Sequence, residues 1–241
     1  MFKEERKNTI LDILNEKEYA SADMLSKILY VSLPTIRRDL AELKEAGLIK
    51  RCHGGATSLS AEKTGMPIEY RINYSQKEKM IVAEKASKLV KSGDVIFIDP
   101  SSTVLDMLPF IKDTDNLTII TNSLRALNTL SDKANIKLYS TGGNFIKSSM
   151  AFAGKRAEEF VSDFNIDTLF FSSAAINEKG MITDYSEQET SFRRAVMKYS
   201  KKVVFLCTGD KLGKDCVYNV CRLDEVDEIV CDVKISNVYS L

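Results

Sequence analysis

The stretch VSLPTIRRDL at positions 31–40 gives the clearest local signal in the chain. Ser32 is a natural N-cap, and Pro34 is tolerated in the first turn of a helix because its missing N–H has no intrahelical partner there. Gly47 suits the position just past a helix, where the backbone turns left-handed. The stretch therefore predicts a helix that begins after Ser32 and runs through Ala46.

The predicted helix has an apolar face and a face suited to DNA. Ile36, Leu40 and Leu43 recur at i, i+4 and i+7, so they are expected to face a core. Arg38 lies opposite this stripe at about 100° per residue. Its neighbours on that face are Pro34, Thr35, Arg37 and Ala41. Small residues there let the helix approach a base edge closely, and an arginine fork can bind guanine or phosphate.

Two further helices and a hairpin are predicted around this helix. One helix covers Phe2–Glu16, and a second begins at Ser21 and ends before Tyr30. A hairpin over Leu48–Leu59 turns at Gly54-Gly55, a dipeptide that supplies the positive φ of a tight two-residue turn. These are the parts of a winged helix-turn-helix. The predicted DNA contacts are Ser32, Thr35, Arg37, Arg38, Lys50, Arg51, His53 and Gly54.

The net charge of this module gives little support for nucleic-acid binding. Residues 1–60 hold ten Lys and Arg against nine Asp and Glu. The alternative interpretation is a surface helix whose two arginines are simply solvated. The arrangement favours double-stranded DNA as the partner, because a capped helix, outward arginines and a glycine turn between basic neighbours occur together.

The pattern changes from about residue 78 onward to alternating strands and helices. The predicted strands are Val95–Asp99, Leu117–Asn122, Ile136–Thr141, Thr168–Ala174, Lys202–Thr208 and Glu228–Asp232. The predicted helices are Lys79–Lys91, Thr103–Ile111, Ser123–Leu130, Lys155–Val161 and Glu187–Tyr199. Apolar strands alternating with amphipathic helices imply a parallel sheet covered on both faces. The predicted organisation is a winged helix-turn-helix at 1–57, a linker at 58–75 and an α/β domain at 76–241.

Polar and small residues follow several predicted strands of the second domain. Ligands of open α/β sheets bind beyond the carboxyl ends of the strands, where helix N-termini offer unpaired N–H groups to anions. Glycine allows close backbone approach, and a lysine adds one positive charge. A pocket for a phosphorylated sugar is therefore expected. Its predicted residues are Asp99, Ser101, Ser102, Thr103, Thr121, Asn122, Ser123, Gly142, Gly143 and Lys211.

Composition excludes several classes of protein. The 241 residues carry 34 basic and 34 acidic side chains, with a single histidine, His53, so a histidine-rich metal site has too few ligands. No cofactor or metal is expected. Five cysteines without a C-x-x-C pair favour reduced thiols in the cytoplasm over a disulfide framework. No apolar run approaches the roughly 20 residues of a membrane-spanning helix, and no export signal is indicated.

Several motifs together resemble one known family. The 31–40 stretch is followed by Gly47-Leu48-Ile49 and by RCHGGA at 51–56, and this combination is similar to the deoxyribonucleoside-repressor (DeoR) family. Further matches are Glu69, Arg71, Lys79, Ile81, Ala83, Gly93-Asp94, Thr121-Asn122-Ser123, Gly142-Gly143 and Lys211. The resemblance implies a bacterial repressor whose α/β domain is related in fold to ribose-5-phosphate isomerase. It also implies a sugar-phosphate effector, homo-oligomers and hydroxyl loops that hold the phosphate.

Two other functions remain open from the residues. A sugar-phosphate isomerase would need a base near a carbon-bound proton, and Asp99, Asp184 and Asp210 are the available carboxylates. Ala174 stands at the strand end where the related enzyme carries an acid. Alternatively, the second domain could serve a DNA-binding regulator only as an oligomerisation scaffold. Loss of the family's glycine, in the DPSST run at 99–103, is compatible with that alternative.

Overall fold

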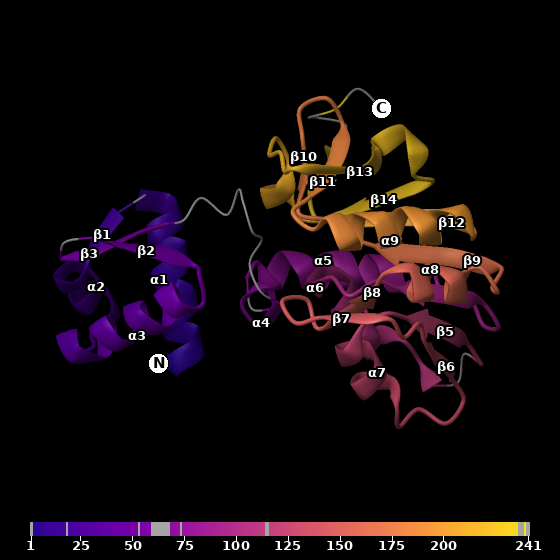
Figure 1. Ribbon diagram of the computed structural model, residues 1–241, viewed down its shortest axis with the longest axis horizontal. Helices are drawn as coiled ribbons and strands as arrows, with labels where there is room; N and C mark the ends of the chain where they lie inside the picture. The colour runs from indigo at the N-terminus through magenta and orange to yellow at the C-terminus, as the bar shows by residue number, and fades with distance from the viewer. Residues whose placement is uncertain are drawn as a thin grey trace. The chain divides into compact units, whose positions relative to one another are not determined.

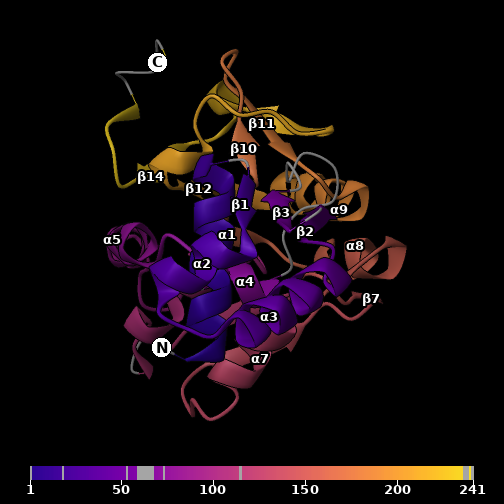
Figure 2. The same cartoon turned by 90° about the vertical axis from the view of Figure 1, so that its left-hand side faces the viewer.

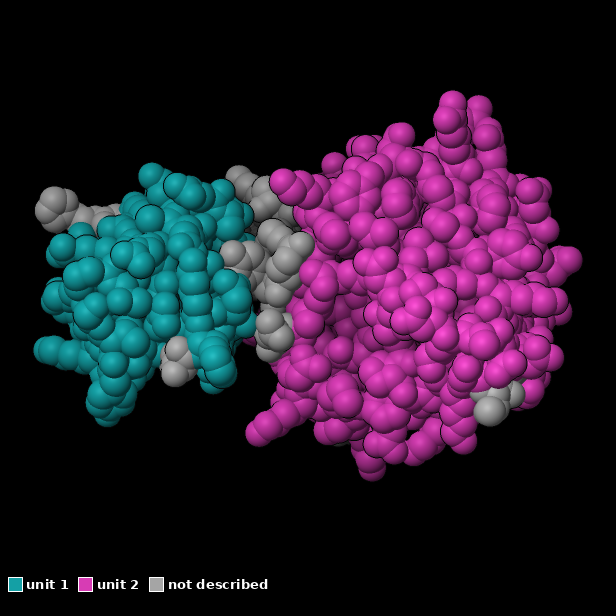
Figure 3. All heavy atoms as spheres, turned by 90° about the horizontal axis from the view of Figure 1, so that it is seen from below, with its two compact units in different colours: residues 1–66 teal, residues 67–241 magenta. Residues whose placement is uncertain are grey.

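The chain folds into two compact units. The computed structural model describes residues 2–17, 19–52, 54–58, 68–72, 74–113, 116–235 and 239 (Figure 1). Contacts between residues divide it into unit 1, residues 1–66, and unit 2, residues 67–241 (Figure 3). The division falls inside the predicted 58–75 linker, of which residues 59–67 lie outside the described part. The boundaries at 57 and 76 stay predictions.

Unit 1 contains the three predicted helices and the hairpin (Figure 2). The helices are α1 (Lys3–Lys17), α2 (Ala22–Leu29) and α3 (Leu33–Glu45). The strands β1 (Tyr19–Ser21), β2 (Ile49–Cys52) and β3 (Gly55–Ser58) form an antiparallel sheet in the order β1-β3-β2. The expected core stripe is confirmed, because Ile36, Leu40 and Leu43 are fully buried.

The ends of α2 and α3 follow from their capping residues. The Ser21 hydroxyl accepts the Met24 N–H at 3.1 Å, and α2 ends where Tyr30 adopts a left-handed φ of 54°. Gly47, with φ 69°, ends α3 and lets the Leu48 N–H return to the Leu43 carbonyl at 2.9 Å. Ser32 is the N-cap residue as predicted, but its hydroxyl pairs with the Thr35 hydroxyl at 2.9 Å instead of capping a backbone N–H.

The predicted hairpin turn is wrong by one residue. Cys52 pairs with Gly55, so Gly55 belongs to strand β3 and the turn precedes it, where Gly54 has a positive φ of 77°. Gly55 is required for a different reason. A Cβ there would lie 2.3 Å from the Ala20 carbonyl oxygen, on the neighbouring strand β1 that the sequence did not predict. The sequence alone does not reveal which of the two adjacent glycines lies in the turn, because either could adopt a positive φ.

Unit 2 is built on a six-stranded parallel sheet in the order β14-β12-β9-β4-β5-β6 (Figure 1). All six predicted strands belong to it. They are β4 (Val95–Ile98), β5 (Thr118–Thr121), β6 (Lys137–Ser140), β9 (Ile166–Phe171), β12 (Ser200–Cys207) and β14 (Glu228–Cys231). The chain runs outward from β4 to β6 and then crosses to β9 on the other side of β4. The β4–β9 pair is therefore the point where the winding direction reverses.

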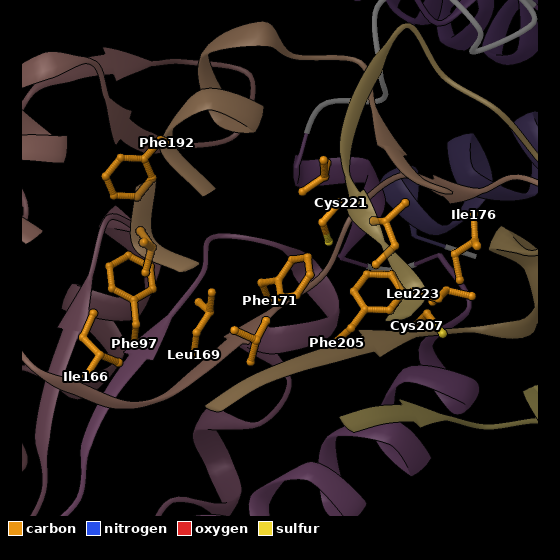
Figure 4. Close-up of a cluster of buried hydrophobic side chains, with 14 of the residues drawn as sticks. Phe97, Ile166, Leu169, Phe171, Ile176, Phe192, Phe205, Cys207, Cys221 and Leu223 are labelled. Carbon is orange, nitrogen blue, oxygen red and sulfur yellow. The ribbon is translucent and has the colours of Figure 1, made fainter. Parts of the chain in front are cut away.

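Helices cover both faces of this sheet, as the alternation of strands and helices predicted. Helices α5 (Gln76–Ser87), α6 (Ser102–Leu105) and α7 (Leu124–Leu130) pack on one face, around Ile98 and Phe170. Helices α8 (Lys155–Val161) and α9 (Glu187–Lys198) pack on the other, where Phe171 and Phe205 meet at 5.0 Å between ring centroids (Figure 4).

Several short elements were not predicted. They are α4 (Ile68–Arg71), the hairpin β7 (Asn144–Ile146) and β8 (Ala151–Ala153), and a small sheet of β10 (Ala175–Ile176), β11 (Met181–Asp184) and β13 (Tyr218–Arg222). The predicted helix over Thr103–Ile111 is divided into α6 and the 3₁₀ turn η1 (Leu108–Phe110). Pro109 explains the division, because proline interrupts the hydrogen bonds of a helix interior.

Candidate functional site

The exposed face of α3 is the candidate DNA-reading surface of unit 1. Arg37 and Arg38 are exposed, and neither is in an ion pair with another described residue. Ser32 is also exposed, and Thr35 is half-buried, so the four predicted contacts lie on the first two turns of α3. An exposed arginine fork at the N-terminal part of a helix is suited to base edges in the major groove.

The opposite side of α3 is held by ion pairs to α1. Asp39 is 1% exposed and receives two hydrogen bonds from the Arg6 guanidinium, at 2.6 and 3.1 Å. Hydrogen bonding to Asp39 raises the pKa of Arg6 above its usual value, although burial acts in the opposite direction. One turn later, Glu42 pairs with Lys7 at 2.6 Å and with Lys3 at 2.7 Å. Their hydrogen bonds lower the pKa of Glu42 to about 2. Sequence reasoning missed these pairs.

The hairpin of β2 and β3, called the wing below, places basic side chains beside α3. Lys50 is exposed on β2, and the half-buried Arg51 reaches within 3.5 Å of the Arg37 carbonyl oxygen through Nη1. Gly54 is exposed at the turn. The predicted contact His53 lies outside the described residues. The structure therefore brings Arg51 next to Arg37, and the assigned roles of both residues at DNA stay predictions.

In unit 2, polar loops meet at the β4–β9 switch point. Ser101, Ser102 and Thr103 follow β4 and open α6, and Ser172 follows β9 directly. Lys211 ends the 3₁₀ turn η3 (Gly209–Lys211) after β12. Its ammonium lies 2.7 Å from the Ser172 hydroxyl and 3.4 Å from the Thr103 hydroxyl. The β4 loop and Lys211 thus meet as predicted, and the lysine ammonium is held by hydroxyl groups.

Two cations that the sequence did not single out as site residues lie near Lys211. Lys79 on α5 is 3% exposed, and its ammonium donates to the carbonyl of Arg71, the last residue of α4. Burial and the charge of Lys211, with a smaller effect of Arg71, lower the pKa of Lys79 to about 8. Burial also lowers the pKa of Lys211. Arg71, Lys79 and Lys211 are named the cation cluster below.

The cation cluster is short of negative charge. Among the described residues, none of its three members has a carboxylate within ion-pair distance, and the Arg71 Nε is buried without a hydrogen-bond partner. Two acids, Asp106 and Asp210, affect Lys79 through their charge without an ion pair. Burial raises the pKa of Asp106, the C-cap residue of α6, and Asp210 adjoins Lys211 in the chain. Lys79 is buried, while Arg71 and Lys211 are half-buried. Three mutually repelling cations beside hydroxyl groups favour an anionic ligand, because an anion removes the repulsion and offsets the cost of burying Lys79.

A buried cage of ion pairs adjoins the same loops. Arg193 on α9 is 4% exposed and binds Asp99 at 2.8 Å, Asp184 at 2.8 Å and Glu189 at 3.3 Å. Burial opposes the charge of Asp184, but Arg193 and the Ser173 hydroxyl outweigh it and lower its pKa. Burial prevails at Glu189 and raises its pKa. The second Asp99 oxygen accepts the Ser101 N–H at 2.8 Å, so this predicted effector ligand already serves the fold.

The loops after β5 and β6 also serve the fold. Thr121 donates to the Ile98 carbonyl at 2.6 Å, and the Ser123 hydroxyl caps α7 by accepting the Ala126 N–H at 3.2 Å. Asn122 donates to the Phe152 carbonyl at 2.8 Å, while its Oδ1 is buried without a hydrogen-bond partner. The Ser101 hydroxyl is likewise buried and unpartnered. These two orphaned groups can still receive a ligand or a water molecule.

The two glycines after β6 are favoured for different reasons. Gly142 has φ 59°, and a Cβ there would meet nothing within 4 Å. Gly143 has φ 108°, and its Cβ would lie 2.7 Å from the Ala153 carbonyl oxygen. The close approach at Gly143 is therefore to β8, and contacts of either glycine with a ligand stay predictions.

Comparison with known proteins identifies both units. Residues 6–62 match the family model of the DeoR-like helix-turn-helix domain, and residues 74–233 match that of the DeoR C-terminal sensor domain. Among curated proteins, the transcriptional regulator GolR of Listeria innocua is 32% identical over 98% of this chain and 93% of its own length. The glycerol-3-phosphate regulon repressor of Escherichia coli is 29% identical over 95% of this chain and 90% of its own length.

Solved structures that resemble the chain include ribose 5-phosphate isomerase A from Methanocaldococcus jannaschii. It is 18% identical, covers 57% of this chain and 54% of that one, and gives a TM-score of 0.41. No helix within the described residues has the length and apolar character needed to cross a membrane. Both units match DeoR models, and the chain matches nearly the full length of relatives that are transcriptional regulators. The protein is therefore a regulator and not an isomerase. The chain belongs to the DeoR family of DNA-binding transcriptional regulators.

Proposed function

We propose that this protein is a cytoplasmic repressor of a carbohydrate operon whose hold on operator DNA is set by a phosphorylated sugar. The observation that carries the proposal is the cation cluster, in which Arg71, Lys79 and Lys211 converge beside hydroxyl groups without a carboxylate partner among the described residues. A phosphate dianion supplies the missing charge, and sugar hydroxyls can pair with the polar groups around it.

The position of the cluster supports a ligand site. It lies by the β4–β9 switch point, where the loops at the carboxyl ends of the strands diverge and open sheets of this class bind their ligands. The Ser101 hydroxyl and the Asn122 Oδ1, both buried without partners, supply one hydroxyl and one acceptor. The remaining predicted pocket residues are kept as proposed contacts of this ligand: Ser102, Thr103, Thr121, Ser123, Gly142 and Gly143.

At the DNA, Arg37 and Arg38 of α3 enter the major groove while Lys50 and Arg51 of the wing contact the backbone. Phosphate contacts supply affinity, and contacts with base edges supply sequence preference. Two or more copies place two α3 helices on repeated or inverted half-sites, about 34–36 Å apart or a multiple of that spacing. The effector favours one arrangement of this homo-oligomer and so changes operator occupancy, with a coupling of about 1–3 kcal/mol.

The name of the Escherichia coli relative gives independent support. That protein is a repressor of a glycerol-3-phosphate regulon, and this chain matches 90% of its length. The chemistry of the cation cluster agrees with a small phosphorylated polyol or sugar as the class of effector.

Calorimetric titration of the full-length protein with paired phosphorylated and unphosphorylated sugars tests the proposal. We expect binding only with the phosphate group present, together with a change in operator affinity measured by fluorescence anisotropy. Lys211→Met should abolish sugar-phosphate binding, whereas Lys155→Met, at an 88% exposed side chain on α8, should leave it intact. Operator binding without a response to any phosphorylated sugar would instead favour the oligomerisation scaffold.

A further inference from the structure

A pair of cysteines occupies neighbouring positions at the carboxyl ends of β12 and β14. These strands are parallel partners, and their register sets Cys207 directly opposite Cys231. Both side chains belong to the same buried cluster on one face of the sheet, where Cys207 lies near Phe205 (Figure 4). Adjacent strands are separated by about 4.8 Å. This spacing lies within the range of about 4.4–6.8 Å between the Cα atoms of disulfide-linked cysteines.

The two thiols lie in register on neighbouring strands, and their pKa values shift in opposite directions. The hydrogen bond to Cys231 and complete burial raise the pKa of Cys207 well above its usual value. The interaction with Cys207 lowers the pKa of Cys231, assisted by the Val233 N–H and opposed by burial and by Asp232, whose carboxylate accepts a hydrogen bond from the Cys231 thiol at 3.4 Å. Cys231 is therefore the sulfur that more readily becomes a thiolate, while Cys207 holds its proton beside it. A thiolate with a neighbouring thiol is the arrangement in which oxidation ends in a disulfide.

Cys231 is also the member of the pair that solvent can reach. It is 9% exposed, against 0% for Cys207. It lines a cavity of about 540 Å³ in the described part of unit 2, together with Lys85, Asp232 and Val233. The Lys85 ammonium lies 3.0 Å from the Cys231 carbonyl oxygen. A small polar oxidant can thus approach Cys231 from the cavity, whereas Cys207 has no exposed surface.

We propose that Cys207 and Cys231 form a redox site that a hydroperoxide converts into an intramolecular disulfide. The Cys231 thiolate attacks one peroxide oxygen, the O–O bond breaks, and the departing hydroxide takes a proton to leave as water. The Cys207 sulfur then attacks the resulting Cys231 sulfenic acid, the S–O bond breaks, and the second hydroxide leaves as water with the Cys207 proton. The two thiols lose two electrons and two protons, and hydrogen peroxide is reduced to two water molecules.

The disulfide would act on the turn that carries Lys211. The Gly209 N–H donates to the Asp232 carboxylate at 2.8 Å, which links the residue after Cys231 to the first residue of η3. An S–S bond of about 2.05 Å draws the sulfurs closer than a hydrogen bond allows, and so shifts this link. This consequence rests on the proposed effector site: oxidation is expected to weaken binding of inorganic phosphate or sugar phosphate about fivefold or more.

The decisive measurement uses the reduced, full-length wild-type protein. Hydrogen peroxide is added, free thiols are alkylated, and tryptic peptides are mapped by mass spectrometry. The expected product joins residues 203–211 to residues 223–234, each of which contains a single cysteine, while Cys52, Cys216 and Cys221 are alkylated. A principal product that links other cysteines, or that carries Cys231 sulfinic acid beside alkylated Cys207, would overturn the proposal.

Two variants sharpen this test. Cys207→Ser should stop the reaction at a Cys231 sulfenic acid, which dimedone traps, whereas Cys221→Ser is the matched buried control and should still form the cross-link. Should Cys207→Ser fail to fold, the wild-type peptide map still decides. Phosphate titration of the oxidised protein is scored separately. A complete cross-link with unchanged phosphate affinity would overturn the coupling to Lys211, while absent phosphate binding in the reduced protein would count against the proposed effector site.

Discussion

The Arg6 guanidinium binds both carboxylate oxygens of Asp39, with Nε 2.6 Å from Oδ2 and Nη2 3.1 Å from Oδ1. Asp39 immediately follows the exposed Arg38 and is itself 1% exposed. The pair therefore fixes the rotation of α3 about its axis relative to α1. This rotation decides which side chains α3 presents to solvent, so a contact in the interior of unit 1 sets the geometry of its candidate DNA-reading face.

Removing one partner of this pair should destabilise unit 1. Arg6→Ala leaves the Asp39 carboxylate buried without its counter-ion, and breaking such a pair typically costs about 3–5 kcal/mol. Hydrogen exchange of the α3 amides in the full-length protein should accelerate accordingly. Lys3→Ala is the control, because its pair with Glu42 is more exposed and is worth roughly 0–1 kcal/mol. Equal protection of the α3 amides in Arg6→Ala and in wild type would show that the Arg6–Asp39 ion pair does not hold α3 in place.

Arg38→Ala should remove sequence preference at the operator. A bidentate arginine contact with guanine discriminates by about 1–3 kcal/mol against a wrong base. Anisotropy titrations with operator and scrambled duplexes should therefore converge for this variant. Lys50→Ala should weaken binding to both duplexes alike and reduce the salt slope by about 0.9, the value for one phosphate contact. An unchanged operator preference in Arg38→Ala would remove this residue from base reading.

Effector affinity should fall as pH rises through about 8. Lys79 is charged below its pKa of about 8 and neutral above it, and only the charged form attracts phosphate. The folding stability of the ligand-free protein should follow the opposite trend and increase as the pH rises. Because this folded pKa is below the ordinary 10.5, the cost of burying the charged lysine is fully present below pH 8 and disappears between pH 8 and 10.5.

Binding above pH 8 should consequently take up protons at Lys79. Titration calorimetry in two buffers with different ionisation enthalpies measures this uptake. Lys79→Met should abolish both the uptake and the pH dependence, while Lys77→Met, at an exposed position on the same helix, should keep both. A pH-independent affinity in wild type between pH 7 and 9.5 would show that the Lys79 charge does not contact the effector.

Lys211→Met should separate the two activities of the protein. The variant removes the ammonium that lies 2.7 Å from Ser172, while α3 and the wing belong to the other unit and are unchanged. Operator affinity should stay within about twofold of wild type, which is roughly 0.4 kcal/mol, while release by the effector is lost. Normal release of operator from Lys211→Met by a phosphorylated sugar would contradict the role of this lysine.

Two adjacent glycines should respond differently to alanine. Gly142→Ala meets nothing within 4 Å and costs only the left-handed backbone strain of about 1–2 kcal/mol. Gly143→Ala adds a Cβ 2.7 Å from the Ala153 carbonyl oxygen at φ 108°, and should cost clearly more. Thermal unfolding of both variants should therefore give a lower Tm for Gly143→Ala. The reverse order would show that β8 can move away from the loop.

The sequence revealed β4, β5, β9 and β12 because each contains a buried apolar run that is followed by polar residues. The edge strand β6 was also predicted, although most of its residues are exposed. It missed β10 and β11 because strands of two and four residues carry no measurable alternation, and their pairing depends on partners far along the chain. The hairpin turn was misplaced because Gly54 and Gly55 are interchangeable in a pattern, although one needs a positive φ and the other needs space.

The candidate site was only half predictable for a related reason. Residues that directly follow strands, such as Ser101 and Thr103, can be found by position. Lys79 and Arg193 come from helices, and their convergence depends on how those helices pack. A usable signal was present: Lys79 shares the buried face of α5 with Val82 and Ala86 at i+3 and i+7. A charged residue on an otherwise apolar stripe indicates a buried partner or a ligand.

The cation cluster also bears on how a small molecule could influence a separate folded unit. Arg71 is the last residue of α4, and α4 begins at Ile68, two residues after the end of unit 1 at residue 66. The Ile68 N–H is tied to the Ser148 carbonyl at 2.8 Å, and Lys79 holds the carbonyl of Arg71. A phosphate bound at the proposed site would therefore act on the first described helix of unit 2.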